Sequence, residues 1–419
     1  MQTKKGLNKR YSTLLVRETT AVQKAHLKKE FELAEASRVA EAACALTNQT
    51  IQAWETTEQV RRLRPGELLL QEQDQQVILP LLNEQALEQL KNGVNHRAVK
   101  RELELCQLEQ LRTVNPQANL EDLWYHVNQS ELSLKRTAAK DFLPEEPLDS
   151  RKVEVPAGQA FQGEIPPEAL QPAQQALVHD WGLRPAQAEA MTEAAARLYK
   201  WCCPQVCQLQ PGQMVWLAHG TKKSRRTDPA LFHPVVLTLL YPQDMGQPLA
   251  TTADLKRLKT RQLERITTEA WKQDAVLTTL DMEWILQLSS TMLRNILENY
   301  SEQHGIILPT AGTVLDMGRT LTHKKIVVEL ALEGLTTQEI ARRIYHTPEA
   351  VDNYLRMFER VLVLKFYGVP RSILPRATGY SKRLLDEHLE LVEKHFPTQE
   401  ELAEYLGQRG IQLEKNSSG

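Results

Sequence analysis

Apolar residues recur at every third or fourth position along most of the chain, which is the spacing of an amphipathic helix. The pattern predicts helices from residue 1 to about 60, and a helical hairpin or a partner-binding helix between Glu67 and Leu120. It predicts a further helical stretch from Ala173 to Tyr199. Two segments differ, Gln213–His219 and Pro234–Pro242, because they are rich in β-branched and aliphatic residues and predict two strands joined by a loop.

These elements predict a mainly α fold with a helical N-terminal region, a small β-hairpin element and a tandem helix-turn-helix C-terminal region. Proline, glycine and charged residues concentrate between 141 and 172, which is typical of a linker. We therefore expect a helical N-terminal domain at 1–140, a Pro/Glu-rich linker at 141–172, a helix plus β-hairpin with a basic loop at 173–250, a first helix-turn-helix unit at 251–320, and a second helix-turn-helix unit with C-terminal helices at 321–419.

The clearest start and stop signals for helices fall in the stretch Thr322–Val361. An apolar helix runs to Gly334, and glycine suits the left-handed position that closes a helix. The segment Thr336–Glu339 is a capping box, which starts a second helix. The pair Thr347–Pro348 starts a third, since threonine caps well and proline is tolerated at the first helical position. The stretch is therefore predicted to hold three short helices with tight joints.

The spacing inside this stretch is typical of a helix-turn-helix that docks on DNA. Ala341 and Val351 lie ten residues apart, where the motif has a small residue at the helix crossing and an aliphatic residue in the shared core. The third helix has an inner apolar stripe, formed by Val351, Tyr354, Leu355, Phe358 and Leu362. Its outer side chains can reach base edges from the major groove. An ordinary three-helix segment of a helical protein would have the same caps, and it remains the alternative.

We expect the DNA contacts of this unit on the third helix and beside it. The candidates on the third helix and its cap are Thr347, Pro348, Glu349, Asp352, Asn353, Arg356 and Arg360. The candidate phosphate anchors are Lys324, Lys325, Arg342 and Arg343. The two acids, Glu349 and Asp352, would repel phosphate unless they accept a hydrogen bond from a cytosine or face protein instead.

A second helix-turn-helix candidate lies upstream. Its first helix starts at a capping-box-like segment, Thr278–Asp281, and Ser289 or Ser290 caps the next helix. The expected outward residues of that helix are Thr291, Arg294, Asn295 and Glu298. The candidate DNA contacts are Ser290, Thr291, Arg294 and Asn295. Glu283 stands where a small residue is needed at the helix crossing, so a packing module is the alternative to groove binding. The connection Gly305–Gly318 is predicted to have wing-like strand character.

Cations also gather outside these units. The loop between the two predicted strands holds four of them, Lys222, Lys223, Arg225 and Arg226, which we treat as candidate phosphate contacts, with a solvated loop as the alternative. The N-terminal helices carry several lysines, among them Lys24, Lys28 and Lys29, for which a solvated helix face is the expected role and phosphate contact is the alternative.

Composition limits the function classes. The 419 residues include 51 Lys and Arg against 53 Asp and Glu, so the chain lacks a strong overall field for polyanions and any DNA affinity must come from local patches. The five cysteines are an odd number without a secretory signal, which fits the cytoplasm. No run of about 18 uncharged apolar residues occurs, so we expect no membrane insertion.

Catalytic and metal motifs are weak. Cys202, Cys203 and Cys207 are the nearest approach to a metal site, but zinc needs four ligands, and His219 and His233 fall on the predicted strands. The chain contains no Gly-rich phosphate loop, no His-Glu-x-x-His and no Gly-x-Ser-x-Gly. We assign no catalytic residue, no metal site and no cofactor, although the scattered carboxylates of a transposase or recombinase would leave little local trace.

The sequence from Leu209 to about Tyr380 resembles a prokaryotic family of domains of unknown function, number 1670. The matching segments are Leu209–Trp216, Pro234–Leu239, Arg265–Ala270, Asp316–Gly318 with Thr322–Lys325, and Ala350–Val361. The resemblance implies a helix-turn-helix protein of bacteria, archaea or their mobile elements, with no assigned chemistry and a cytoplasmic location.

The main hypothesis from the sequence is a sequence-specific DNA-binding protein that regulates transcription or a mobile element, with double-stranded DNA as its partner. Two alternatives stay open. One is a transposition or recombination protein that recognises element ends through the helix-turn-helix units, and the other is a protein-interaction adaptor. The sequence also leaves open whether the chain forms a homodimer.

Overall fold

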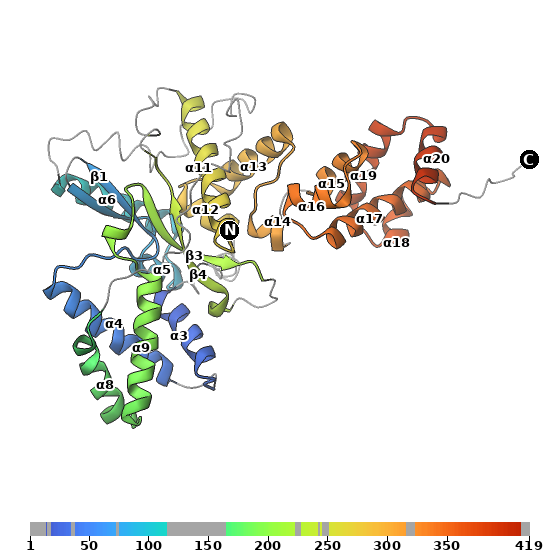
Figure 1. Cartoon of the computed structure of the whole chain (residues 1–419). Helices are drawn as coiled ribbons and strands as arrows, with labels where there is room; N and C mark the ends of the chain where they lie inside the picture. Colours follow the sequence, from blue (N-terminus) through green and yellow to red (C-terminus); the bar gives the residue numbers. More distant parts are fainter. Residues whose placement is uncertain are drawn as a thin grey trace, which may run out of the picture. The chain divides into compact units, whose positions relative to one another are not determined.

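The computed structural model of the chain describes residues 14, 18–34, 38–72, 75–114, 165–222, 228–241, 244, 251–315 and 323–411. The chain forms two compact units (Figure 1). The amino-terminal unit comprises Met1–Gln303 and Pro309–Leu315, and the carboxy-terminal unit comprises His304–Leu308 and Asp316–Gly419. Every helix in the described ranges is too short or too polar to cross a bilayer.

The amino-terminal unit combines helices with a small antiparallel sheet, in agreement with the predicted mainly α class. Its helices are α3 (Thr19–Glu30), α4 (Val39–Thr57), α5 (Glu84–Lys91), α6 (His96–Val114), α8 (Pro167–Trp181), α9 (Pro185–Cys202), α11 (Thr252–Lys272), α12 (Thr279–Ile285), α13 (Ser290–His304) and α14 (Ala311–Leu315), with 3-10 turns η3 (Val206–Gln208) and η4 (Pro229–Leu231). Its strands are β1 (Glu67–Glu72), β2 (Gln75–Pro80), β3 (Gln213–Gly220), β4 (Phe232–Thr238) and β5 (Ala275–Val276).

The sheet has the strand order β2-β1-β3-β4, with β5 paired to β3. The predicted hairpin is β3 and β4, whose register runs from Gln213↔Thr238 to His219↔Phe232. The helix predicted after Glu67 is wrong for its first part, because β1 and β2 form a second hairpin there. The leucine and isoleucine spacing of this segment fits a helix by coincidence. What makes it a strand is its pairing with a distant segment, Leu68↔Met214, which local periodicity does not reveal.

One helical layer of the amino-terminal unit joins parts that the sequence separates. Helix α4 packs against α8 and α9, and α3 packs against α4 and α9, so that the four helices lie together in Figure 1. Glu55 of α4 is buried in this layer. Its carboxylate pairs with Arg62 and accepts a hydrogen bond from Tyr199 Oη of α9 at 3.1 Å. Helices from the predicted N-terminal domain and from the predicted 173–250 region therefore share one core.

The described part of the connection after α13, residues 305–315, contains no wing-like strand. Residues Ala311–Leu315 form the short helix α14, and Thr310 makes only an isolated bridge with Leu277. Thr310 explains the outcome, because its hydroxyl accepts a hydrogen bond from the Thr313 N–H at 3.3 Å and so caps a helical turn. The expectation of strand character in Gly305–Gly318 is therefore wrong for this part, and residues 316–318 lie outside the described residues.

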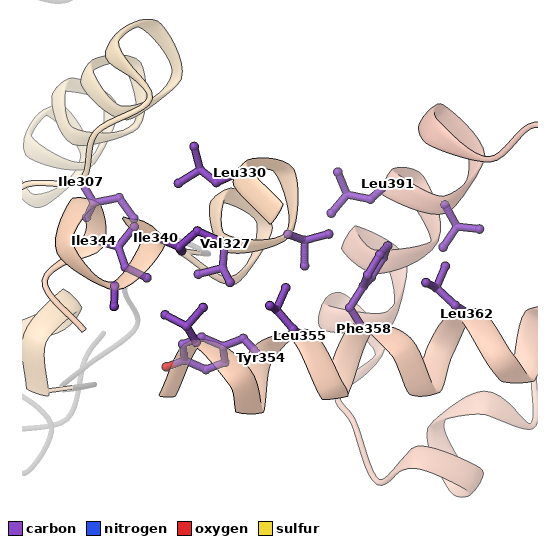
Figure 2. Close-up of a cluster of buried hydrophobic side chains, with 14 of the residues drawn as sticks. Ile307, Val327, Leu330, Ile340, Ile344, Tyr354, Leu355, Phe358, Leu362 and Leu391 are labelled. Atoms are coloured by element: carbon purple, nitrogen blue, oxygen red, sulfur yellow. The ribbon is translucent and has the colours of Figure 1, made fainter. Parts of the chain in front are cut away.

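In its described residues, the carboxy-terminal unit contains helices joined by loops and no strand. Its helices are α15 (His323–Leu332), α16 (Thr337–Ile344), α17 (Pro348–Phe366), α18 (Leu374–Thr378), α19 (Lys382–His395) and α20 (Gln399–Gln408). Helix α17 is central, because α15, α16, α18, α19 and α20 all pack against it. Figure 2 shows the side chains that fill the space between these helices, with Leu355, Phe358 and Leu362 projecting from α17.

Candidate nucleic-acid interface

The joint between α15 and α16 is built as the sequence predicts. Gly334 has φ of +93°, and the N–H groups of Gly334 and Leu335 donate to Ala331 O and Leu330 O, each at 3.1 Å. This pair of bonds is the Schellman arrangement that ends a helix. Helix α16 then starts in a capping box, in which the Thr336 N–H donates to Glu339 Oε2 at 2.8 Å. Four residues, 333–336, therefore join the two helices.

The joint between α16 and α17 is equally tight. Tyr345 adopts the left-handed conformation, with φ of +57°, and the N–H of His346 donates to Ala341 O at 3.1 Å. The Thr347 hydroxyl then caps α17 by accepting from the Ala350 N–H at 3.3 Å. The sequence did not predict this left-handed residue, since a tyrosine there lacks the glycine signal on which such predictions depend.

The inner faces of the three helices agree with the prediction. Ala341 and Val351 are both buried at the crossing of α16 and α17. The predicted inner stripe of α17 is buried in full, through Val351, Tyr354, Leu355, Phe358 and Leu362. Val327 of α15 and Ile340 of α16 point into the same cluster (Figure 2). This shared core fixes which side of α17 faces outward.

The outward side of α17 carries a continuous polar stripe. Glu349, Asn353, Arg356 and Arg360 follow one another at steps of four, three and four residues, and all are exposed. Two more cations, Arg342 and Arg343, are exposed on the last turn of α16. We call these six residues the outer stripe. Lys324 and Lys325 lie in the first turn of α15, and their side chains are outside what the structure describes.

The acidic residues in and beside the outer stripe accept hydrogen bonds from groups of α16 and α17 and their caps. Asp352 accepts a hydrogen bond from the Thr337 hydroxyl of α16 at 3.0 Å, so its carboxylate faces protein. Hydrogen bonds from the Thr336 N–H and hydroxyl lower the pKa of Glu339, and its own N–H together with the Thr347 hydroxyl lowers the pKa of Glu349. Sequence reasoning missed the role of Thr337, because the bond joins two different helices.

The upstream unit repeats the same backbone hydrogen bonds. A shift of 58 residues brings Thr278 into register with Thr336, and both head a capping box. Leu288 N–H donates to Glu283 O at 3.2 Å, as His346 does to Ala341 in the later unit. Gln287 has φ of +56° in the place of Tyr345. Ser289 caps α13 through the Met292 N–H at 3.2 Å, in the place of Thr347. The two helix-turn-helix segments therefore share the same caps and the same turn between their helices.

The two helix-turn-helix segments differ in how far the side chains of their first helix are buried. In α12, the positions equivalent to Gln338, Arg342 and Arg343 are occupied by Leu280, Trp284 and Ile285, and all three of these are buried. Lys100 of α6 lies over the Trp284 ring at 5.1 Å and donates to Glu283 O at 3.2 Å. On a helix-turn-helix, the first helix crosses the DNA backbone. Here Lys100 of α6 contacts that helix and the three equivalent positions are buried, which favours the packing alternative for this unit.

The residues predicted to face outward on α13 are exposed, apart from Glu298, which is half-buried. Thr291, Arg294 and Asn295 are exposed and Ser290 is half-buried. The inward side is also as predicted, since Leu293, Ile296, Leu297 and Tyr300 are buried. In the basic loop, Lys222 is exposed just after β3, whereas Lys223, Arg225 and Arg226 lie outside the described residues.

The cysteines and histidines considered as metal ligands do not form one cluster among the described residues. Cys202 and Cys203 are buried, and burial raises the pKa of the Cys203 thiol to about 12. Cys207 is exposed. His219 lies on β3 and His233 on β4, as the strand prediction implied. Among the described residues, no group of three or more His, Cys, Asp or Glu side chains is arranged to hold a metal ion.

A family model described as "Protein of unknown function (DUF1670)" matches residues 178–391, just over half of the 419 residues. The chain belongs to this family. The resemblance predicted from Leu209 to Tyr380 is thereby confirmed, and the DUF1670 match extends beyond it at both ends. The match spans both helix-turn-helix segments and the β3–β4 hairpin. Comparisons with curated proteins and with solved structures gave no match.

Proposed function

We propose that this DUF1670 protein is a cytoplasmic regulator of transcription or of a mobile element, which binds double-stranded DNA sequence-specifically with α17 in the major groove. The observation that carries the proposal is the outer stripe. It exposes an asparagine and four arginines over two helices whose inner sides are sealed in a common core. A purely structural three-helix segment has no need of such a concentration of guanidinium groups at one helix joint.

The chemistry of the outer stripe suits a division of labour. Asn353 can bond adenine and Arg356 can bond guanine through paired hydrogen bonds in the major groove. Arg342 and Arg343 lie at the end of α16, the helix that crosses the backbone in this motif, and suit phosphate contacts. Each good paired contact to a base gives about 1–3 kcal/mol of discrimination.

The nearby acids do not oppose this assignment. Asp352 is engaged by Thr337, and Glu339 is engaged at the start of α16. Glu349 lies in the first turn of α17, where a carboxylate is favoured by the partial positive charge of the helix end. The outer stripe itself holds four arginines against one acid, Glu349, and so presents a net positive charge to a polyanion.

Selection of bound duplexes from a random library, followed by affinity measurements at several salt concentrations, tests the proposal. We expect a defined sequence and an affinity that falls steeply with salt, because phosphate contacts release counterions. Arg356→Ala should relax the preference at one base pair, at a cost of about 1–3 kcal/mol. The matched control is Arg376→Ala, which removes an exposed arginine of α18 in the same unit.

Two results would contradict the proposal. One is binding that does not change with salt. The other is an Arg356→Ala variant that selects the same sequence, with the same stringency, as the Arg376→Ala control.

A further inference from the structure

Helix α20 packs against α17 in the opposite direction, within the carboxy-terminal unit. Its first residue, Gln399, donates from Nε2 to Phe366 O at the end of α17, at 3.0 Å. Just beyond its last residue, Arg409 donates from Nε to Glu359 Oε1 at 2.8 Å. Glu359 lies seven residues before Phe366 on α17. The end of α20 therefore lies beside the middle of α17.

The end of α20 is fixed in the same way as the end of α15. Gly410 has φ of +77°, and its N–H donates to Gly407 O at 3.0 Å, while the N–H of Ile411 donates to Leu406 O at 2.9 Å. These are the two bonds of the Schellman arrangement. Leu406 and Ile411 also pack into the core of the unit. The backbone of Arg409, the residue before Gly410, is thus held by a closed helix end.

The guanidinium of Arg409 is oriented by α17 but only partly used. The side chain of Glu359 is 16% exposed, whereas that of Arg409 is 43% exposed. In the part of the chain that the structure describes, Nε is the one guanidinium nitrogen of Arg409 that makes a hydrogen bond. An arginine presents its N–H groups as a planar fork. The two terminal amino groups of Arg409 can therefore bind an anion while Nε keeps its carboxylate.

Arg409 lies on the flank of the outer stripe. Glu359, its partner, follows Arg356 by three residues and precedes Arg360 by one, so it borders the stripe. The charge of Asp352, four residues before Arg356, also acts on Arg409. A helix with its side chains is about 10–12 Å wide, which is close to the width of about 12 Å of the major groove. The flanks of a helix in that groove therefore face the phosphate backbones.

We propose that Arg409 is a phosphate contact of the DNA-binding site, supplied by α20 beside the helix that reads the bases. This inference rests on the proposed function and extends the site from two helices to three. Phosphate suits Arg409 because a guanidinium can bind two phosphate oxygens through parallel N–H groups. Glu359 is a positioning residue, since it holds Nε and leaves the terminal amino groups for the ligand. Sequence spacing gave no sign of this contact, because the two partners lie 50 residues apart.

The test measures how the affinity of the full chain for the selected duplex depends on salt. Arg409→Gln removes the guanidinium. Arg371→Gln is the matched control, because Arg371 also pairs with an acid, Asp386, at the surface of the same unit. We expect Arg409→Gln to bind all duplexes more weakly and to lower the slope of log affinity against log salt by about one. It should select the same sequence as the wild type, and the control should keep the wild-type slope.

A second variant separates a contact with DNA from a role in the fold. Glu359→Gln removes the ion pair but keeps an oxygen that can accept from Nε of Arg409, and Arg409 keeps its charge. We therefore expect Glu359→Gln to retain the wild-type salt slope. If Arg409→Gln and Glu359→Gln instead weaken binding equally and leave the slope unchanged, the pair only supports the packing of α20 on α17, and the inference is overturned.

Three further outcomes distinguish this inference from the proposed function. If Arg409→Gln has the salt slope of the Arg371→Gln control while Arg356→Ala still relaxes the base preference, Arg409 is not a phosphate contact and the proposed function stands. If Arg409→Gln changes the selected sequence, Arg409 reads a base and its assignment to phosphate is wrong. If the wild-type chain does not bind DNA, both proposals are wrong.

Discussion

At the scale of single residues, the acids on and beside α17 have different roles. Asp352 looks like a base-contacting residue in the sequence, since it falls one position before Asn353 on the predicted outer side. In the structure it is half-buried and bonded to Thr337 across the helix joint. Its charge is therefore used to hold α16 against α17. Asn353, one position later, is exposed and keeps its amide available to solvent.

Removing the donor of this bond should weaken the joint. Thr337→Val keeps the shape of the side chain but leaves the Asp352 carboxylate without the hydroxyl, 3.0 Å away in the wild type. Because both groups are half-buried, water replaces part of the bond, and we expect a loss of about 1 kcal/mol in the free energy of unfolding. Urea unfolding followed by far-UV circular dichroism measures it. Thr337→Ser, which retains the hydroxyl, should unfold close to the wild type, and equal losses in both variants would rule out this role for the hydroxyl.

At the scale of elements, the capping box of α16 makes a pH-dependent contribution. Bonds from Thr336 hold the pKa of Glu339 below its ordinary value of 4.5. A carboxyl whose pKa is lower in the folded state stabilises that state above its unfolded pKa, and the contribution is lost as the pH falls through the folded pKa. Glu339→Gln should therefore be less stable than the wild type at neutral pH, by a difference that shrinks towards about pH 3.

Urea unfolding at both pH values measures this difference. Glu333→Gln, which removes an exposed acid at the end of α15, is the matched control for the loss of one surface charge. A stability difference between Glu339→Gln and the wild type that stays constant or grows at acid pH would contradict the capping role.

The elements also mark how far the sequence predicts the fold and the candidate site. Thr278, Thr336 and Thr347 were all recognised as helix caps, because a cap and the N–H group it satisfies lie within a few residues of each other. The β1–β2 hairpin was missed, since its place in the sheet depends on Leu68 meeting Met214. The covering of α12 by Lys100 was missed for the same reason. The outer stripe was predictable from spacing, whereas the bond between Thr337 and Asp352 required α16 and α17 to be brought together.

At the scale of the whole molecule, the two compact units have separate cores, and the distribution of tryptophan makes this testable. All seven tryptophans lie between Trp54 and Trp284, in the sequence of the amino-terminal unit. Tryptophan fluorescence therefore reports on that unit, while far-UV circular dichroism reports on the helices of both. A chain with two independently packed cores need not unfold in one two-state transition.

A cavity in one core should consequently leave the other core intact. Phe358 is buried in the carboxy-terminal unit, where its ring packs edge-on against His388 with 5.5 Å between centroids. Phe358→Ala should cost that unit about 3–5 kcal/mol, and shift the dichroism transition to lower urea while the fluorescence transition stays in place. Phe232→Ala, at an equally buried position beside His219 in the amino-terminal unit, should shift the fluorescence transition. If Phe358→Ala moves the fluorescence transition as far as the dichroism transition, the units unfold together, and variants in the two units could then not be treated as energetically independent.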